Sequence, residues 1–126
     1  MDAHYHLGLL HFAHLLVSAD GEADIRELDA LFKIKIRENI PEATLRKFDA
    51  VTKLLTEREV YQAGLEHLAS CSDEEKLKVF ATLYRLSEVD GRVHVKEIRL
   101  LLYAVKTAGI EFNDVVDFAK KNPSIF

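Results

Sequence analysis

The sequence has few of the residues on which small secreted or nucleic-acid-binding proteins depend. Cys71 is its one cysteine, so no internal disulfide can form, and this favours a reducing compartment. Lysine and arginine number 17 against 21 aspartates and glutamates, which gives a formal net charge of −4 at pH 7. No basic stripe interleaved with aromatic residues occurs. Because binding to phosphates requires clustered Lys and Arg, we expect no nucleic-acid partner.

Long hydrophobic runs are also lacking. The most apolar stretch, residues 7–17, is interrupted by Gly8, His11 and His14, and it is far shorter than the ~20 residues that span a bilayer. The first residues have neither a basic start nor a small-residue cleavage site, so we expect no signal peptide. These features predict a cytoplasmic protein that does not insert into a membrane.

Glycine and proline are scarce, with five and two residues, which fits helices joined by short connections. The single fragment that alternates like a strand, residues 92–95, lies inside an expected loop. At 126 residues with 48% apolar content, the chain is long enough for one hydrophobic core. We therefore predict an all-α fold, a single compact bundle of about seven helices in one domain spanning residues 1–126.

One acidic turn occurs twice, at a spacing of seventy residues. The first copy runs from Asp20 to Glu27 and the second from Asp90 to Glu97, each as Asp-Gly, five residues and then glutamate. Apolar positions around the turns match at the same spacing along about fifty residues. Two copies are too few for a solenoid, which needs about three. The sequence therefore predicts a duplicated helix-loop-helix with internal pseudo-two-fold symmetry.

The repeat halves are expected at about 4–55 and 72–122, with a linker helix at about 57–69. Capping-box sequences at Asp24, Thr56 and Ser72 begin three of the helices, because each is followed three residues later by a glutamate. The predicted helices are approximately 4–18, 24–38, 41–55, 57–69, 73–88, 95–108 and 112–121. Asn39 and Gly109 are expected left-handed stops at helix ends. The core face of the second helix is expected to contain Ile25, Leu28, Leu31, Phe32 and Ile36.

With both turns in view, the chain resembles the tellurite-resistance TerB-like family over nearly its whole length. The resemblance rests on residues 19–21 (Ala-Asp-Gly) with Glu27, and on residues 89–91 (Val-Asp-Gly) with Glu97. It implies a non-enzymatic, stress-associated domain whose paired acidic turns are suspected of binding a divalent metal ion or a partner.

Each turn also resembles the second half of an EF-hand loop, because glycine is followed six residues later by glutamate. The first ligand position would be Leu16 or Leu86, which cannot bind an ion through its side chain, so an ordinary EF-hand is excluded. A weak site, or one shared by both turns, stays open. Its candidate ligands are Asp20, Asp24, Glu27, Asp90 and Glu97. The alternative is that these carboxylates only hydrogen-bond the turn backbone and cap helices.

Four histidines lie near the start of the chain, at positions 4, 6, 11 and 14. Helical spacing places His4, His11 and His14 on one side of the first helix, where a transition metal ion could bind. The alternative is that they are helix residues partly covered by their neighbours. His14 aligns with Tyr84 in the repeat and is expected to be half-buried for that reason.

The residues therefore favour a binding module over an enzyme. No phosphate-binding glycine loop, nucleophile elbow or His-Glu-x-x-His helix occurs, and we expect no organic cofactor. The expected ligands are a divalent cation at the acidic turns and a protein partner. The alternative function is a structural or dimerisation scaffold in which the turns cap helices and an apolar helix face meets a partner.

Overall fold

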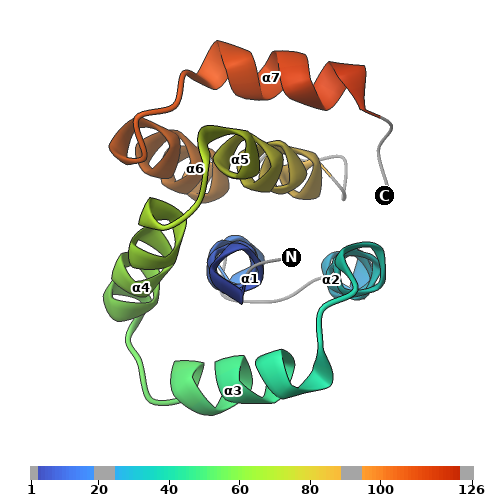
Figure 1. The fold of residues 1–126 in the computed structure, drawn as a ribbon, viewed down its shortest axis with the longest axis vertical. Helices are drawn as coiled ribbons and strands as arrows, with labels where there is room; N and C mark the ends of the chain where they lie inside the picture. The colour runs from blue at the N-terminus through green and yellow to red at the C-terminus, as the bar shows by residue number, and fades with distance from the viewer. Residues whose placement is uncertain (1–2, 19–24, 89–94, 123–126) are drawn as a thin grey trace.

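The computed structural model describes residues 3–18, 25–88 and 95–122, and within these ranges the chain forms seven α-helices and no strand (Figure 1). The predicted all-α bundle is therefore confirmed. The helices are α1 (Ala3–Ser18), α2 (Ile25–Glu38), α3 (Glu42–Thr52), α4 (Glu57–Ala69), α5 (Asp73–Ser87), α6 (Val95–Thr107) and α7 (Phe112–Lys121). No helix in these ranges has the length and apolarity that a bilayer span requires.

The third helix is shorter than predicted. Pro41 is its N-cap rather than its first helical residue, with extended backbone at φ −62° and ψ 144°. Beyond Thr52 the helical hydrogen bonds give way to three-residue turns, in which the Leu54 amide donates to the carbonyl of Val51. Leu54 is 85% exposed. No burial of its side chain stabilises a further helical turn, so the prediction that α3 continues to about residue 55 is wrong.

Helix α1 lies at the centre of the molecule (Figure 1). In this view α2 and α4 flank it, α3 lies below it and α5 above it. Its side chains are buried around most of its circumference, including Tyr5, Leu9, Phe12 and Leu16. A helix surrounded on all sides must be apolar on all sides, and this explains the apolar stretch at residues 7–17.

The local structure of α2 and its exit recurs at α6, seventy residues later. Asn39 and Gly109 both adopt the left-handed conformation, with φ of 50° and 77°, which confirms the two predicted stops. The amide of the following residue, Ile40 or Ile110, donates to a carbonyl five residues earlier in each copy. This pattern is the Schellman motif. A two-fold relation between the complete halves, and the single-domain boundary, stay predictions.

The prediction for the buried faces is wrong at several positions. Phe32 and Ile36 are 58% and 63% exposed, and the buried residues of α2 include Ala30 and Ile34. Apolar residues occur on both sides of this helix, so their spacing does not decide which side packs against α1. His14 is exposed rather than half-buried, because it lies on α1 at a position that its neighbours leave open.

Candidate functional site

The carboxylates predicted to bind metal fall largely outside the described residues. Asp20, Asp24 and Asp90 are not described, and Glu27 and Glu97 lie in the first turns of α2 and α6, where the backbone alone is described. The predicted divalent-metal site therefore stays a prediction.

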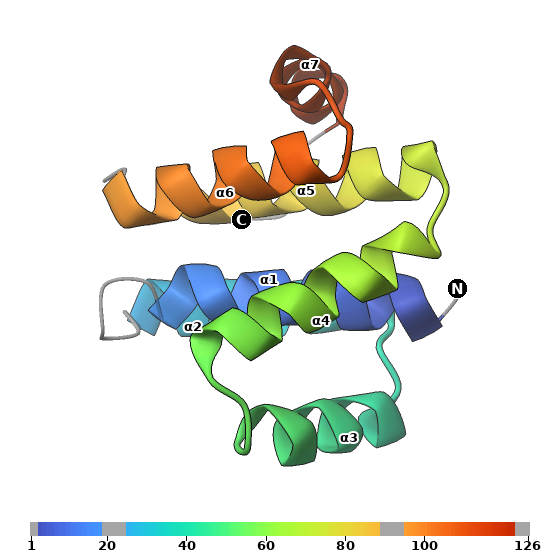
Figure 2. The ribbon, with the colours of Figure 1, turned by 90° about the vertical axis from the view of Figure 1, so that its left-hand side faces the viewer.

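The helix ends that flank the two acidic turns lie at one end of the molecule (Figure 2). Helices α1 and α5 end there, and helices α2 and α6 begin there. This arrangement follows from the alternating direction of the four helices. Helix α2 runs back along α1, and α6 runs back along α5. The first residues of α1 and the last residues of α4 lie at the opposite end.

At that opposite end, three histidine side chains meet between α1 and α4. The Nδ1 atoms of His4 and His67 are 3.0 Å apart and form a hydrogen bond. The ring of His11 lies 5.2 Å from the ring of His67, measured between centroids. The ring of Phe48, from α3, packs edge-on against His11 at 4.9 Å. Of the three histidines expected on one side of α1, His4 and His11 contact His67, which comes from a distant part of the sequence, whereas the ring of His14 lies 5.9 Å from that of Phe48.

The protonation of this cluster is constrained by its contacts. The Nδ1 atom of His11 lies 2.6 Å from the Leu7 carbonyl oxygen, which can only accept, so Nδ1 carries the proton and Nε2 keeps its lone pair. Burial lowers the pKa of His11. Burial also lowers the pKa of His67, helped by the two neighbouring histidines and Lys47 and opposed by Glu66. His11 and His67 therefore favour the neutral imidazole.

Two glycines explain how close α1 and α4 come. A Cβ atom on Gly64 would lie 2.9 Å from Cε2 of Phe12, and one on Gly8 would lie 3.0 Å from Cδ2 of Leu68. The two helices therefore touch where each lacks a side chain, and the separation of packed helices depends on the side chains at the contact. This close approach brings the histidine rings of α1 into contact with His67.

A second polar cluster surrounds Glu38, at the end of α2. Its carboxylate is almost fully buried and accepts from the Tyr5 hydroxyl at 3.1 Å and from the Arg37 guanidinium at 2.7 Å. Lys78 lies 3.6 Å from its other oxygen. Arg37 also donates to the Thr82 hydroxyl at 2.8 Å, so the cluster ties α2 to α1 and α5. Burial, followed by the neighbouring Glu38, raises the pKa of Tyr5, and the phenol stays protonated.

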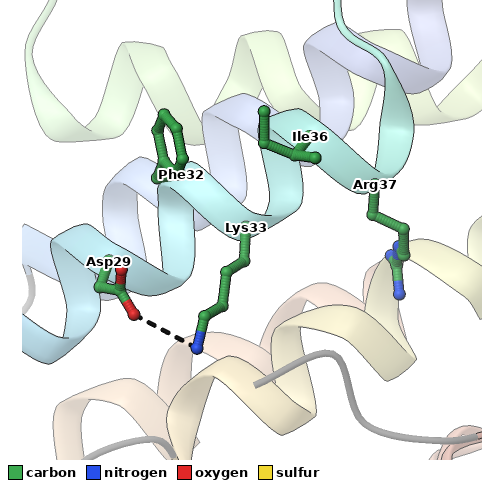
Figure 3. Close-up of a pocket in the computed structure, with 5 residues that line it drawn as sticks. All are labelled: Asp29, Phe32, Lys33, Ile36 and Arg37. Carbon is green, nitrogen blue, oxygen red and sulfur yellow. Dashed lines mark ion pairs between the residues drawn. The ribbon is translucent and has the colours of Figure 1, made fainter.

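A third feature is an apolar hollow on the outer surface of α2 (Figure 3). Phe32 and Ile36 lie one turn apart along it, and the hollow, which is open to solvent, has a volume of about 420 Å³. Asp29, Lys33 and Arg37 complete its lining. Asp29 and Lys33 form an ion pair at 3.3 Å, so charges of both signs stand beside exposed apolar side chains.

Comparison with known proteins gives no relative. The chain matches no protein-family model, no curated protein and no solved structure. The resemblance to the TerB-like family therefore stays a prediction. Within residues 3–18, 25–88 and 95–122, no three or more His, Cys, Asp or Glu side chains are grouped so that they could hold a metal ion.

Sequence reasoning did not find His67, Glu38 or the exposed side of α2. Nothing in the sequence joins His67 to the histidines near the start of the chain, because sixty-three residues separate it from His4. A signal for the exposed side of α2 does exist in the repeat. Position 36 corresponds to Lys106, and position 34 corresponds to the buried Ala104.

Proposed function

We propose that this chain is a non-catalytic, TerB-like binding module whose two acidic turns bind one divalent cation together. The observation that supports it is that four helix ends lie at the same end of the molecule (Figure 2). Each acidic turn joins two of these ends, from α1 to α2 and from α5 to α6. A cytoplasmic location and a stress-associated role belong to the same proposal.

One acidic turn alone supplies too few oxygen ligands for a divalent cation, and sharing the site between both turns removes this difficulty. A Ca²⁺ ion takes roughly six to eight oxygen ligands, and Mg²⁺ takes about six, more than one turn supplies. Pooled carboxylates from both turns, together with water, meet that requirement. The proposed ligands are Asp20, Asp24, Glu27, Asp90 and Glu97. A protein partner that carries its own basic groups is the next ligand class for the same acidic surface.

An amide NMR titration of the whole chain tests the cation. Ca²⁺, Mg²⁺, Mn²⁺ and Zn²⁺ are added in turn, and we expect saturable changes confined to residues 18–27 and 88–97. The double variant Asp20→Asn/Asp90→Asn should lose them and keep its helical circular dichroism. The matched control is Asp49→Asn/Asp117→Asn, which removes the same charge from exposed positions on α3 and α7. Equal losses in the two double variants, or no change at millimolar ion, contradict the proposal.

The exposed side of α2 favours a second candidate function, a scaffold that forms a homodimer. Phe32 and Ile36 are large apolar side chains that stay more than half exposed. The rim carries Asp29 and Lys33, one turn apart and of opposite charge. In a two-fold symmetric pair of α2 helices, each aspartate can face the other copy's lysine, so the surface is self-complementary. The proposed occupant is therefore a second copy of this chain.

Light scattering during size-exclusion chromatography tests this candidate. We expect a dimer that becomes a monomer in Phe32→Asp. The control is Leu102→Asp, at the equivalent exposed position of α6. A monomer for the unmodified chain at 100 μM, or an unchanged dimer in Phe32→Asp, rejects the dimer.

A further inference from the structure

We propose that His4 and His67 form a second metal site, which binds a divalent transition-metal ion through their two Nδ1 atoms. The site lies between the first turn of α1 and the last turn of α4. That is the end of α1 remote from the acidic turns (Figure 2). It is built from nitrogen rather than oxygen ligands, so it goes beyond the proposed function and does not depend on it.

The distance between the two nitrogens is the first argument. With metal–nitrogen bonds of about 2.05 Å, two ligands are ~2.9 Å apart at a right angle and ~3.3 Å apart at the tetrahedral angle. The Nδ1 atoms of His4 and His67 are 3.0 Å apart. This separation matches adjacent corners of a square-planar or octahedral ion. Imidazole ligands in such geometry favour Ni²⁺ and Cu²⁺.

The rigidity of the two supporting helices is the second argument. His67 is adjacent to Leu68, which packs against Gly8 of α1, and both Leu68 and Gly8 are buried. The two ligands therefore come from helices whose separation is already fixed by the packing of the Leu68 side chain against Gly8. Fixing ligands in advance reduces the ordering cost of binding.

The surroundings of the pair supply neutral nitrogen donors. His11 stands beside His67 and donates its Nδ1 proton to the Leu7 carbonyl, the hydrogen bond that metal-binding histidines commonly make through their other nitrogen. Its Nε2 atom keeps a lone pair, and its ring centroid lies 5.2 Å from that of His67. The described residues do not group three such side chains around one point, so the protein supplies two ligands and water completes the shell.

Metal binding moves one imidazole proton from Nδ1 to Nε2 of the same ring, and the protein releases no proton. In the hydrogen-bonded pair one ring carries its proton on Nδ1 and the other accepts it. When the ion occupies both Nδ1 atoms, that proton transfers to Nε2 of the same ring, and both rings stay neutral. The ion replaces the hydrogen bond as the link between α1 and α4.

Titration calorimetry with NiCl₂ on the untagged whole chain, at pH 7.5 in a buffer without chelating groups, tests the site. We expect saturable 1:1 binding, with at least a tenfold loss of affinity in His67→Gln and in His4→Gln. The matched control is His14→Gln, an exposed histidine of α1 outside the pair, which should leave the affinity within twofold. Paramagnetic Ni²⁺ should also broaden the imidazole NMR signals of His4 and His67 before those of His14.

The variant Asp20→Asn/Asp90→Asn separates this site from the acidic turns, because it should keep its Ni²⁺ affinity. A loss in that variant as large as in His67→Gln would assign the nickel site to the turns. The inference is also overturned if the unmodified chain shows no saturable Ni²⁺ binding, or if His14→Gln weakens binding as much as His67→Gln does.

Discussion

At the scale of single residues, the contact between α1 and α4 depends on two positions that have no side chain. Gly8 faces Leu68, and Gly64 faces the ring of Phe12. Glycine in a helix interior costs about 1 kcal/mol relative to alanine, so its presence twice in one contact needs a packing reason. The reason is the close approach of the two helices. The Phe12 ring is almost fully buried and cannot swing away from an added methyl group.

Gly64→Ala should therefore destabilise the fold, although alanine is the better helix former. Overpacking a tight core contact costs typically ~1–3 kcal/mol, which outweighs the ~1 kcal/mol gained in helix propensity. Urea denaturation measures the difference. Gln62→Ala, at an exposed position of the same helix, should change the free energy of unfolding by less than about 0.5 kcal/mol. A Gly64→Ala variant more stable than the unmodified chain would show that the helices can separate at no cost.

Two histidines, the buried His11 and the half-buried His67, make the stability depend on pH. The pKa values of His11 and His67 are lowered in the folded state, mainly by burial, from about 6.5 in the unfolded chain. The unfolded chain then binds more protons than the folded one as the pH falls below about 6.5, so stability is full above that pH and declines as the pH falls through the folded pKa values. Urea denaturation in the presence of EDTA should show this decline between pH 7.5 and 5. His67→Gln should have a shallower decline than His14→Gln, and equal slopes would contradict this origin.

At the scale of the helices, the two halves of the chain use the same stop signal. Asn39 and Gly109 occupy equivalent places after α2 and α6 and share the left-handed backbone and the same hydrogen-bond pattern. Asparagine is the residue other than glycine that most readily takes this conformation. The two repeats differ here by asparagine in place of glycine, and both residues are compatible with the left-handed conformation.

Gly109→Ala should destabilise the chain by about 1 kcal/mol, since an L-residue with a Cβ atom costs ~1–2 kcal/mol in the left-handed conformation. Apart from the two chain neighbours of Gly109, no heavy atom of the described residues lies within 4 Å of the added methyl group, so the cost comes from the backbone alone. Gly109→Asn should cost less, because Asn39 already occupies the equivalent place. Thermal melts rank the two variants. If both lose the same stability, the equivalence of the two stops does not extend to their energetics.

Helix positions could be predicted from the sequence because their signals are local. The capping boxes at Thr56 and Ser72 form as expected, with both reciprocal hydrogen bonds in each. The buried side of α2 could not be predicted in the same way. Ile34 and Ile36 are both apolar, and packing against the rest of the bundle leaves the first buried and the second exposed. That choice depends on tertiary contacts, which periodicity within one helix does not contain.

The candidate sites also differ in whether their signal is local in the sequence or depends on tertiary contacts. The acidic turns were visible in the sequence because each is a short contiguous motif. The partnership of His4 with His67 was not, because it requires α4 to run antiparallel to α1. Glu38 was hidden for a similar reason, since its hydrogen-bond donors include Tyr5, thirty-three residues earlier.

At the scale of the whole molecule, α1 joins the two halves. It packs against α2 and α3 of its own half, and also against α4, α5 and α6. Phe12 illustrates this position, because its ring lies 5.7 Å from Tyr61 of α4 and 6.2 Å from Phe80 of α5. An element that contacts both halves couples their unfolding, so we expect one cooperative transition despite the repeated sequence.

Phe12→Ala tests that coupling. Truncating a buried phenylalanine costs about 3–5 kcal/mol of stability. The protection of amides in both halves should fall by that full amount. Native-state hydrogen exchange is the measurement, with protected amides of α3 reporting on the first half and those of α7 on the second. Leu54→Ala removes an apolar side chain that is 85% exposed, and it should leave both sets of amides unchanged. If Phe12→Ala lowered protection in α3 and left α7 unchanged, the second half would be an independent folding unit. Equal losses mean that the two halves form one folding unit through α1.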